Sequence, residues 1–245
     1  MPLILVHSPK GGVGSTFVAA QLALHLARKG HQVSAIDFTF QDSLKLFFNM
    51  LPSQSLLDMV DTQSEALVVS GVSLANGHTL SRDPAFHDLL LQTDGTPFGG
   101  DRITIADVAS DDRALKALLL PHAVLHICVL MPRPASLATL TKIEPGTPAV
   151  ELKKTVFVLN HLDDRRRLSR DTHSFVRELF GPQLIGTIRR DEAVNEALAM
   201  FEPIEKFAPT SAVLPDLLAL CGAVEERCGL VAPLDRLADA GRLPA

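Results

Sequence analysis

Residues 8–16, SPKGGVGST, have the composition of a loop that can hold a phosphate group. Gly11, Gly12 and Gly14 leave the backbone free to direct several N–H groups at one anion. A helix that begins at about Thr16 would add the positive end of its dipole, and the Thr16 hydroxyl could ligate Mg²⁺. A run of strand-like apolar residues precedes the loop and a helical pattern follows it, which is the context that such a loop requires.

Two positions of this loop depart from the general phosphate-binding pattern G-x-x-x-x-G-K-[ST]. Pro9 stands where the first glycine would be, and Ser15 stands where the lysine would be. The string KGGVGST nevertheless resembles the K-G-G-x-G-K-[ST] loop of the MinD/ParA ATPases, which carry an additional lysine at the front. The resemblance implies a site for ATP and Mg²⁺ that is built from Lys10, Gly11, Gly12, Val13, Gly14, Ser15 and Thr16. In that family the front lysine reaches the ATP of the other subunit, so Lys10 is the expected trans-acting, catalytic residue of a homodimer.

Four further residues occupy positions that the MinD/ParA resemblance places in the nucleotide site. Asp37 and Asp107 each end a predicted core strand, and both match family aspartates that order Mg²⁺ and its waters. Asn160 matches a strand-end asparagine that recognises adenine, to which an amide can both donate and accept. Arg189 lies in the segment that borders adenine, where the family often has proline. For Asp37 and Asn160, the residues alone leave open a turn-forming role at a strand end.

Ser15 and Thr39 stand where the resembled family has two groups that promote ATP hydrolysis. A lysine at position 15 would place a full positive charge against the phosphates. An acidic residue at position 39 would position the attacking water. Because charge stabilisation matters most in the transition state, these departures should impair turnover more than binding. We therefore expect an ATP-binding protein with slow or absent hydrolysis.

Short, nearly continuous runs of Val, Ile and Leu alternate with helical patterns along the chain. Such runs are typical of parallel strands that are buried on both faces. The predicted strands cover residues 3–8, 32–37, 103–107, 124–131, 155–160 and 184–188. The alternation predicts an α/β fold with a mostly parallel sheet and helices on both faces. Together with the glycine loop and the MinD/ParA resemblance, it implies a single P-loop domain over residues 1–245. Ligands of such folds bind at the carboxyl ends of the strands.

The clearest helical pattern covers residues 17–30, with Gly30 as its stop. Two other helices are predicted over residues 171–181, capped by Asp171 or Thr172, and over residues 190–201. The segments ANGHTLSRDP and QTDGTPFGGD, both between residues 50 and 101, are expected to be loops. The tail from about residue 230 is expected to be peripheral.

The composition is that of an ordinary soluble globular protein. Hydrophobic residues make up 47% of the 245 residues, charged residues make up 21%, and the net charge is −5. The acidic balance argues against a protein that coats DNA, and the three cysteines do not describe a disulfide framework. We see no signal peptide and no apolar run long enough to span a bilayer. These features predict a cytoplasmic protein that would reach the inner membrane only through partners.

Residues 190–220, RDEAVNEALAMFEPIEKFAPTSAVLPDLLAL, resemble the C-terminal segment of the BcsQ (YhjQ) branch of MinD-like proteins. That branch is associated with bacterial cellulose synthesis, and some of its members also lack the loop lysine. The resemblance implies an ATP-bound homodimer that regulates or localises cytoplasmic subunits of the cellulose synthase complex. Two alternatives stay open, namely a partition or pole-positioning ATPase with real turnover and an interaction protein that has lost its nucleotide.

Overall fold

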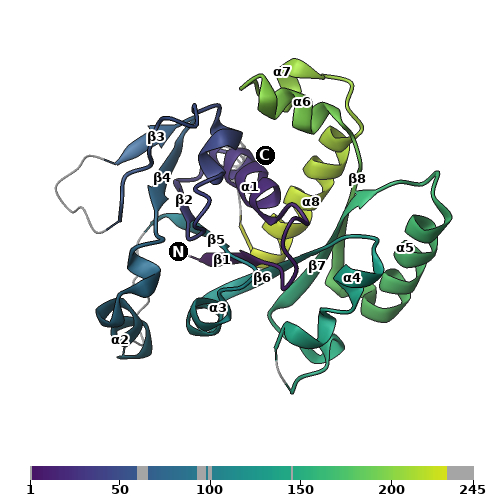
Figure 1. Ribbon diagram of the computed structural model, residues 1–245, viewed down its shortest axis with the longest axis horizontal. Helices are drawn as coiled ribbons and strands as arrows, with labels where there is room; N and C mark the ends of the chain where they lie inside the picture. Colours follow the sequence, from purple (N-terminus) through teal and green to yellow (C-terminus); the bar gives the residue numbers. More distant parts are fainter. Residues whose placement is uncertain (1, 60–65, 93–97, 99–100, 145, 231–245) are drawn as a thin grey trace, which may run out of the picture.

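The computed structural model describes residues 2–59, 66–92, 98, 101–144 and 146–230 (Figure 1). Eight strands form one sheet in the order β3-β4-β2-β5-β1-β6-β7-β8. Neighbouring strands pair in parallel except β3 and β4, which are antiparallel. The strands are β1 Leu3–His7, β2 Val33–Asp37, β3 Leu67–Val69, β4 Val72–Asn76, β5 Ile103–Val108, β6 Ala123–Leu130, β7 Thr155–Leu162 and β8 Leu184–Arg189. The predicted α/β fold with a mostly parallel sheet is confirmed.

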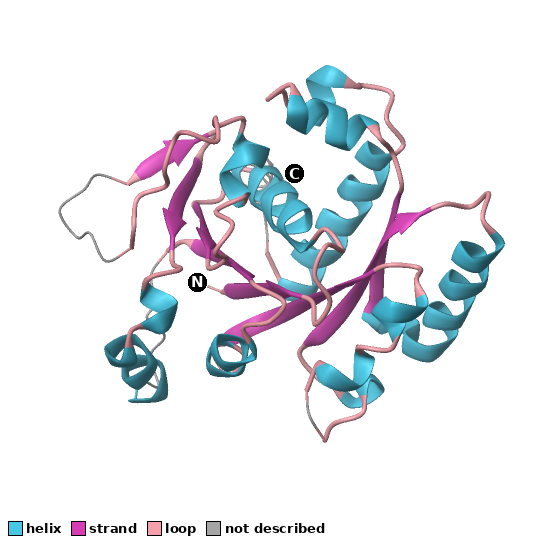
Figure 2. Ribbon diagram, in the orientation of Figure 1, coloured by secondary structure: helices cyan, strands magenta, loops and turns pink. Residues whose placement is uncertain are grey.

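Helices cover both faces of this sheet, as Figures 1 and 2 show. The α-helices are α1 Ser15–Arg28, α2 Pro84–Gln92, α3 Arg113–Leu119, α4 Pro134–Leu137, α5 Arg167–Phe180, α6 Ala193–Ala199, α7 Ile204–Phe207 and α8 Val213–Cys228. Short 3₁₀ helices are η1 Leu44–Phe48, η2 Leu80–Arg82, η3 Leu140–Lys142, η4 Ala149–Glu151 and η5 Gly181–Gln183. Helices α1 and α8 lie on one face, and α2, α3, α4 and α5 lie on the other (Figure 1). Among the described residues, no helix is both long enough and apolar enough to cross a membrane.

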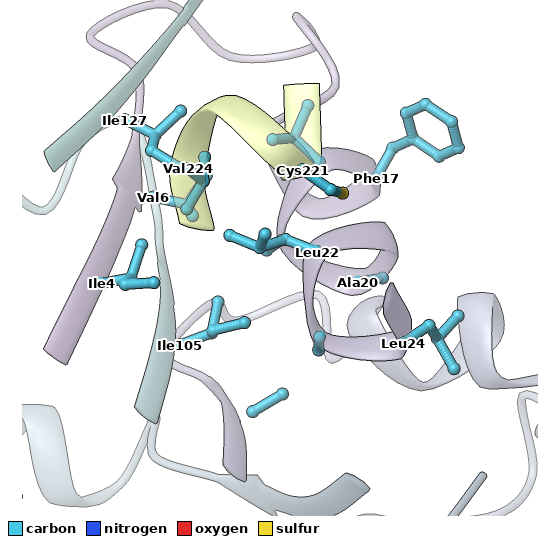
Figure 3. Packing of buried hydrophobic residues seen from close by; sticks show 14 of the residues in the cluster. Ile4, Val6, Phe17, Ala20, Leu22, Leu24, Ile105, Ile127, Cys221 and Val224 are labelled. Atoms are coloured by element: carbon cyan, nitrogen blue, oxygen red, sulfur yellow. The ribbon is translucent and has the colours of Figure 1, made fainter. Parts of the chain in front are cut away.

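The largest core cluster fills the space between the sheet and helices α1 and α8 (Figure 3). Its labelled members are Ile4, Val6, Ile105 and Ile127 from strands, Phe17, Ala20, Leu22 and Leu24 from α1, and Cys221 and Val224 from α8. Ala19, Ala20 and Ala23 of α1 are fully buried. Side chains this small let the helix approach its neighbours closely, and the close packing fixes α1 and the loop before it against the sheet.

The six predicted strands lie within two residues of the observed ones, but β3 and β4 escaped prediction. These two strands form a hairpin whose two connecting residues, Ser70 and Gly71, both have positive φ. That is the backbone of the two-residue turns that fit the twist of a hairpin. Strand β4 ends in Asn76 and is followed directly by Gly77, two residue types that are frequent in turns, so its sequence resembles the beginning of a loop. The segment ANGHTLSRDP therefore includes a strand end, contrary to the expected loop.

Helix α5 begins at Arg167, four residues before the predicted start. The proposed caps Asp171 and Thr172 are therefore wrong, because both lie inside the helix and Thr172 is buried. Arg166 is the N-cap residue and makes no side-chain capping bond. The predicted stop at Gly181 is confirmed, since this residue ends the helix with φ +50°.

The other local predictions have mixed outcomes. Gly30 follows the last turn of α1 with φ +86°, as its predicted role as a stop requires. Helix α6 covers residues 193–199 and is shorter than predicted at both ends. Most of the segment QTDGTPFGGD and the tail from residue 231 lie outside the described residues.

Candidate nucleotide-binding site

The glycine loop runs from the carboxyl end of β1 into α1 and depends on two glycines with positive φ. Gly14 is the N-cap residue of α1 with φ +91°, and Gly12 has φ +72°. A Cβ atom at Gly14 would lie 2.3 Å from Nδ2 of Asn160. Two of the three glycines expected to surround phosphate therefore have a backbone conformation that only glycine adopts without strain.

Asn160 on β7 holds the glycine loop in place. Its Nδ2 donates a hydrogen bond to the Val13 carbonyl at 2.9 Å, and its Oδ1 accepts one from the His161 N–H at 2.8 Å. The side chain is 4% exposed and borders the cavity described below. Two of its hydrogen-bonding positions are thus used inside the protein, which gives Asn160 a structural role beside the predicted contact with adenine.

Asp37 and Asp107 are register partners on the neighbouring strands β2 and β5. Paired residues of a sheet point to the same face, and here that face is the one covered by α1, because Val6 pairs with Asp107 and packs in the α1 core. Asp37 accepts hydrogen bonds from the Thr39 N–H at 2.8 Å and the Leu44 N–H at 2.9 Å. Its carboxylate therefore shapes the loop after β2.

Asp107 is 1% exposed, and neither of its carboxylate oxygens has a hydrogen-bond partner within the described part of the chain. Burial, followed by the charge of Asp37, raises the pKa of this carboxyl from 3.8 to about 7. The Thr16 hydroxyl is close enough to oppose this shift in pKa, but it makes no hydrogen bond of normal geometry with Asp107. Buried polar groups normally have partners, so this carboxylate requires one.

A Mg²⁺ ion would satisfy that requirement. Asp107, Asp37 and Thr16 offer only oxygen atoms, the ligands that Mg²⁺ prefers. The two carboxylates lie side by side in the sheet, and a divalent cation would remove the repulsion between them. The residues predicted to hold Mg²⁺ thus fit that ion, because one of their buried carboxylates has no partner among the residues that the structure describes.

A cavity of about 730 Å³ adjoins the glycine loop. Its volume is in the range of sites that bury a cofactor-sized ligand. Gly12, Gly14 and Asn160 line it, and Ile188 and Arg189 of β8 lie on its other side. The cavity therefore brings together the loop and both segments that were predicted to meet the base.

Arg189 already has a protein partner. Its Nε and a terminal nitrogen contact the two carboxylate oxygens of Asp216 at 2.9 and 2.8 Å, and its backbone N–H donates to the same carboxylate at 2.9 Å. The ion pair ties the end of β8 to α8. Arg189 borders the cavity as predicted, but these donors are in use, so its contact with adenine stays a prediction.

The prediction about hydrolysis depends on Lys10, Ser15 and Thr39. Lys10 is exposed, and its ammonium group has no ion pair or hydrogen bond to any described residue, so the side chain can reach outward. Ser15 is the first residue of α1. Thr39 is 6% exposed, and its hydroxyl has no hydrogen bond of normal geometry among the described residues. A hydroxyl at this position cannot act as a carboxylate base.

His161 is a cavity residue that the sequence did not reveal. It has φ +59°, and its Nε2 would lie 3.9 Å from a Cβ atom on Gly14. Burial, followed by the positive charges of Arg190 and Arg133, lowers the pKa of its imidazole. The only signal in the sequence was its place directly after the strand-end asparagine. A left-handed backbone at a non-glycine residue often marks a functional position.

The fold and the site together define a class of protein. A parallel sheet carries a glycine loop after its first strand, followed by a helix, and two aspartates at the ends of neighbouring strands face that helix. This is the arrangement of a P-loop nucleotide-binding protein.

Comparisons with known proteins place the chain more narrowly. A family model for the CobQ/CobB/MinD/ParA nucleotide-binding domain matches residues 4–204, so the chain belongs to that family. A search of curated proteins found no match.

Solved structures of MinD and ParA proteins have the same fold. A ParA family ATPase from Chlorobium tepidum TLS is 20% identical, with a TM-score of 0.67 over 91% of this chain and 97% of that one. MinD from Pyrococcus horikoshii OT3, solved with Mg-ADP, is 19% identical, with a TM-score of 0.66 over 94% and 98%. The MinC:MinD cell division complex of Aquifex aeolicus matches at 14% identity, with a TM-score of 0.68 over 100% and 98%.

Proposed function

We propose that this protein binds ATP with Mg²⁺ as a homodimer and hydrolyses it slowly or not at all. The observation that carries the proposal is the buried carboxylate of Asp107, which has no hydrogen-bond partner among the described residues and is paired in register with Asp37. The Mg-ADP complex of the Pyrococcus MinD, which shares the fold, supports the choice of ligand.

Each residue of the site has a role in this proposal. The backbone N–H groups of the loop that contains Gly11, Gly12 and Gly14 hold the phosphates, aided by the N-terminus of α1. Thr16, Asp37 and Asp107 hold Mg²⁺, in part through water. Bound Mg²⁺ supplies positive charge against the phosphates. Neither an ammonium group at position 15 nor a carboxylate at position 39 is present to promote hydrolysis.

The nucleotide then acts as a structural ligand that stabilises a dimer and the surface this dimer presents to partners. Ligands that bind only the folded, assembled state shift the equilibrium towards it by mass action, without turnover. The resemblance of residues 190–220 to BcsQ supports cytoplasmic subunits of a cellulose synthase complex as the partners. The association of the Aquifex MinD with MinC supports the more general idea of a protein partner.

The second candidate is a partition or positioning ATPase, and the family membership favours it. The two proposals differ in turnover, since such an ATPase must hydrolyse ATP repeatedly.

We expect purified protein to release ATP or ADP on denaturation, as measured by chromatography, and to show almost no turnover. If the protein releases no nucleotide and also fails to bind added ATP with Mg²⁺, both proposed functions are refuted. Robust turnover that DNA stimulates would favour partition.

Changing Lys10 to alanine should weaken ATP-dependent dimerisation and leave the monomer intact. Lys10 is exposed, and its ammonium group has no hydrogen bond or ion pair among the described residues, so truncating the side chain breaks none of these interactions. A charge-assisted hydrogen bond to phosphate contributes about 1.5–3 kcal/mol, which corresponds to at least about tenfold weaker association. Light scattering with ATP and Mg²⁺ measures the effect. Lys153→Ala, at another exposed lysine, is the control, and an unchanged dimer in Lys10→Ala would contradict the trans role.

Changing Ser15 to lysine should tighten ATP binding by about tenfold, because an ammonium group would then face the phosphates. Turnover should stay low, since Thr39 still lacks a carboxylate. Isothermal titration calorimetry gives the dissociation constant, and phosphate release gives the turnover. Ser15→Met adds similar length without charge and should not tighten binding. Equal affinities for the lysine and methionine variants would show that position 15 does not face phosphate.

A further inference from the structure

A second cavity, of about 600 Å³, lies on the other face of the sheet from α1. The lining comes from α3, from residues of η3 and η4 with Ile143, Glu144 and Thr147 between them, and from Thr155 at the start of β7. Helix α3 lies on the side of the sheet opposite α1 and α8 (Figure 1). His7, the last residue of β1, lies at its base. His7 and Val6 point to opposite faces, so this cavity is distinct from the nucleotide site.

Lys116 is a buried cation that borders this cavity. Its side chain belongs to α3 and is 5% exposed. Nζ donates one hydrogen bond to the Ile143 carbonyl at 2.6 Å, and the residue forms no ion pair within the described part of the chain. An ammonium group has three N–H donors, and a buried charge is costly unless it is paired. The negative charge of Glu144 acts on Lys116 from the lining of the same cavity, but the two side chains form no ion pair. Within the described residues, Lys116 therefore has no carboxylate in direct contact.

His7 provides a second unpartnered group in the same cavity. It is 1% exposed, and neither ring nitrogen makes a hydrogen bond of normal geometry to a described residue. Burial first, then the charge of Lys116, lowers its pKa to about 4, against a backbone interaction with Ser110 that raises it. His7 is therefore neutral near pH 7 and offers one donor and one acceptor.

The ring centroids of His126 and His7 are 5.9 Å apart, but one ring nitrogen of His126 already has a hydrogen-bond partner. Its Nδ1 pairs with Oγ1 of Thr155 at 2.9 Å. The imidazole of His7 is thus the ring that both borders the cavity and lacks partners on both nitrogens in the described structure.

The rest of the lining is apolar inside and cationic at the surface. Leu120, Ile143 and Leu152 form the apolar part. The charged residues of the lining are Arg113, Lys116, Lys142, Lys153 and Lys154, opposed by Glu144 and Glu151. A net positive lining around an apolar interior attracts anions, and the apolar part favours an anion with a hydrophobic body.

We propose that this cavity is a second binding site, which takes a small carboxylic acid with an apolar body. The carboxylate pairs with the Lys116 ammonium and accepts a hydrogen bond from the His7 ring, and the body packs on Leu120, Ile143 and Leu152. The site does not depend on the proposed ATP function, because none of these residues lines the nucleotide cavity.

Three probes of matched size or charge test this proposal on the full-length protein by isothermal titration calorimetry. Octanoate has both the charge and the apolar body, octanol has the body alone, and inorganic phosphate has the charge alone. We expect octanoate to bind at least about tenfold more tightly than either of the others. Equal binding of octanol would show an apolar cavity in which the charge has no role. Tighter phosphate binding that Lys116→Met weakens would indicate an inorganic anion site in this cavity, whereas phosphate binding that Lys116→Met leaves unchanged belongs to the glycine loop. The absence of saturable octanoate binding would overturn the proposal.

Lys116→Met keeps most of the side-chain length and removes the charge. It should weaken octanoate binding by at least about tenfold and leave octanol binding unchanged. Lys142→Met removes an exposed charge from the rim and should change octanoate binding by less than about threefold. Because Lys116→Met could fail to fold, ¹⁵N NMR of the His7 imidazole in the unmodified protein is a second measurement. An imidazole signal that octanoate does not shift would also refute the site.

Discussion

Replacing Gly14 by alanine should destabilise the folded protein and abolish nucleotide binding. Gly14 has φ +91°, a backbone conformation that costs an alanine about 1–2 kcal/mol. The added Cβ would also lie 2.3 Å from Nδ2 of Asn160, so this side chain or the loop must move. Losing the hydrogen bond from Asn160 to the Val13 carbonyl costs about 1 kcal/mol more. We expect a total loss of about 2–4 kcal/mol in the free energy of unfolding, measured with urea, and no ATP binding by calorimetry.

Gly12 provides the matched control. It has φ +72°, but a Cβ atom there would meet nothing within 4 Å. Gly12→Ala should therefore show the backbone strain alone, about 1 kcal/mol. Asn160→Ala removes the clashing atoms, so adding it to Gly14→Ala should cost less than the sum of the two single losses. Equal losses for Gly12→Ala and Gly14→Ala would contradict the steric role of Asn160.

Much of this site was predictable because its signals are local. The glycine loop, the strand before it and the helix after it follow one another in the sequence, and the structure has all three. Asp37 and Asp107 were identified as strand-end residues, and the parallel topology brings them into register. Buried parallel strands have a strong apolar pattern, so the order of strands and helices could be inferred well.

The features that could not be predicted depend on contacts between distant segments. The bond from Asn160 to Val13 joins residues that are 147 positions apart, and that from Arg189 to Asp216 joins residues 27 apart. Neither has a signature in its own segment. Likewise, β4 ends in Asn76 and passes directly into Gly77, so its sequence resembles a loop, and its place in the sheet follows from pairing with β2. Motifs thus indicate which residues gather at a site, while packing decides which atoms remain free for a ligand.

That distinction matters most for the two aspartates. Asp37 satisfies two backbone N–H groups, so its carboxylate contributes to the fold whether or not Mg²⁺ is present. Asp107 satisfies nothing in the described protein, and its ionised form costs stability. A residue that destabilises the protein until a ligand arrives is the expected result of building a binding site into a buried position.

Changing Asp107 to asparagine should stabilise the protein without nucleotide at neutral pH and abolish its response to ATP with Mg²⁺. Between pH 3.8 and about 7 the unfolded chain has an ionised Asp107 while the folded chain keeps the proton. The unfolded state then binds fewer protons, so stability falls as the pH rises through this window and is constant above it. At about 1.4 kcal/mol for each pKa unit, the full penalty is roughly 4 kcal/mol. A neutral asparagine has no such penalty.

The measurement is the free energy of unfolding in urea for both proteins from pH 5 to pH 8. The advantage of Asp107→Asn should grow by roughly 2 kcal/mol between pH 5 and pH 7 and then level off by pH 8. ATP with Mg²⁺ at a hundredfold excess over its dissociation constant should raise the free energy of unfolding of the unmodified protein by about 2.7 kcal/mol. It should leave that of the variant almost unchanged. Asp37→Asn is the contrasting control: its amide offers one acceptor to two N–H donors, so it should lose stability at every pH. An advantage that does not change with pH would show that Asp107 is already ionised with a partner, and the proposed Mg²⁺ site would lose its main support.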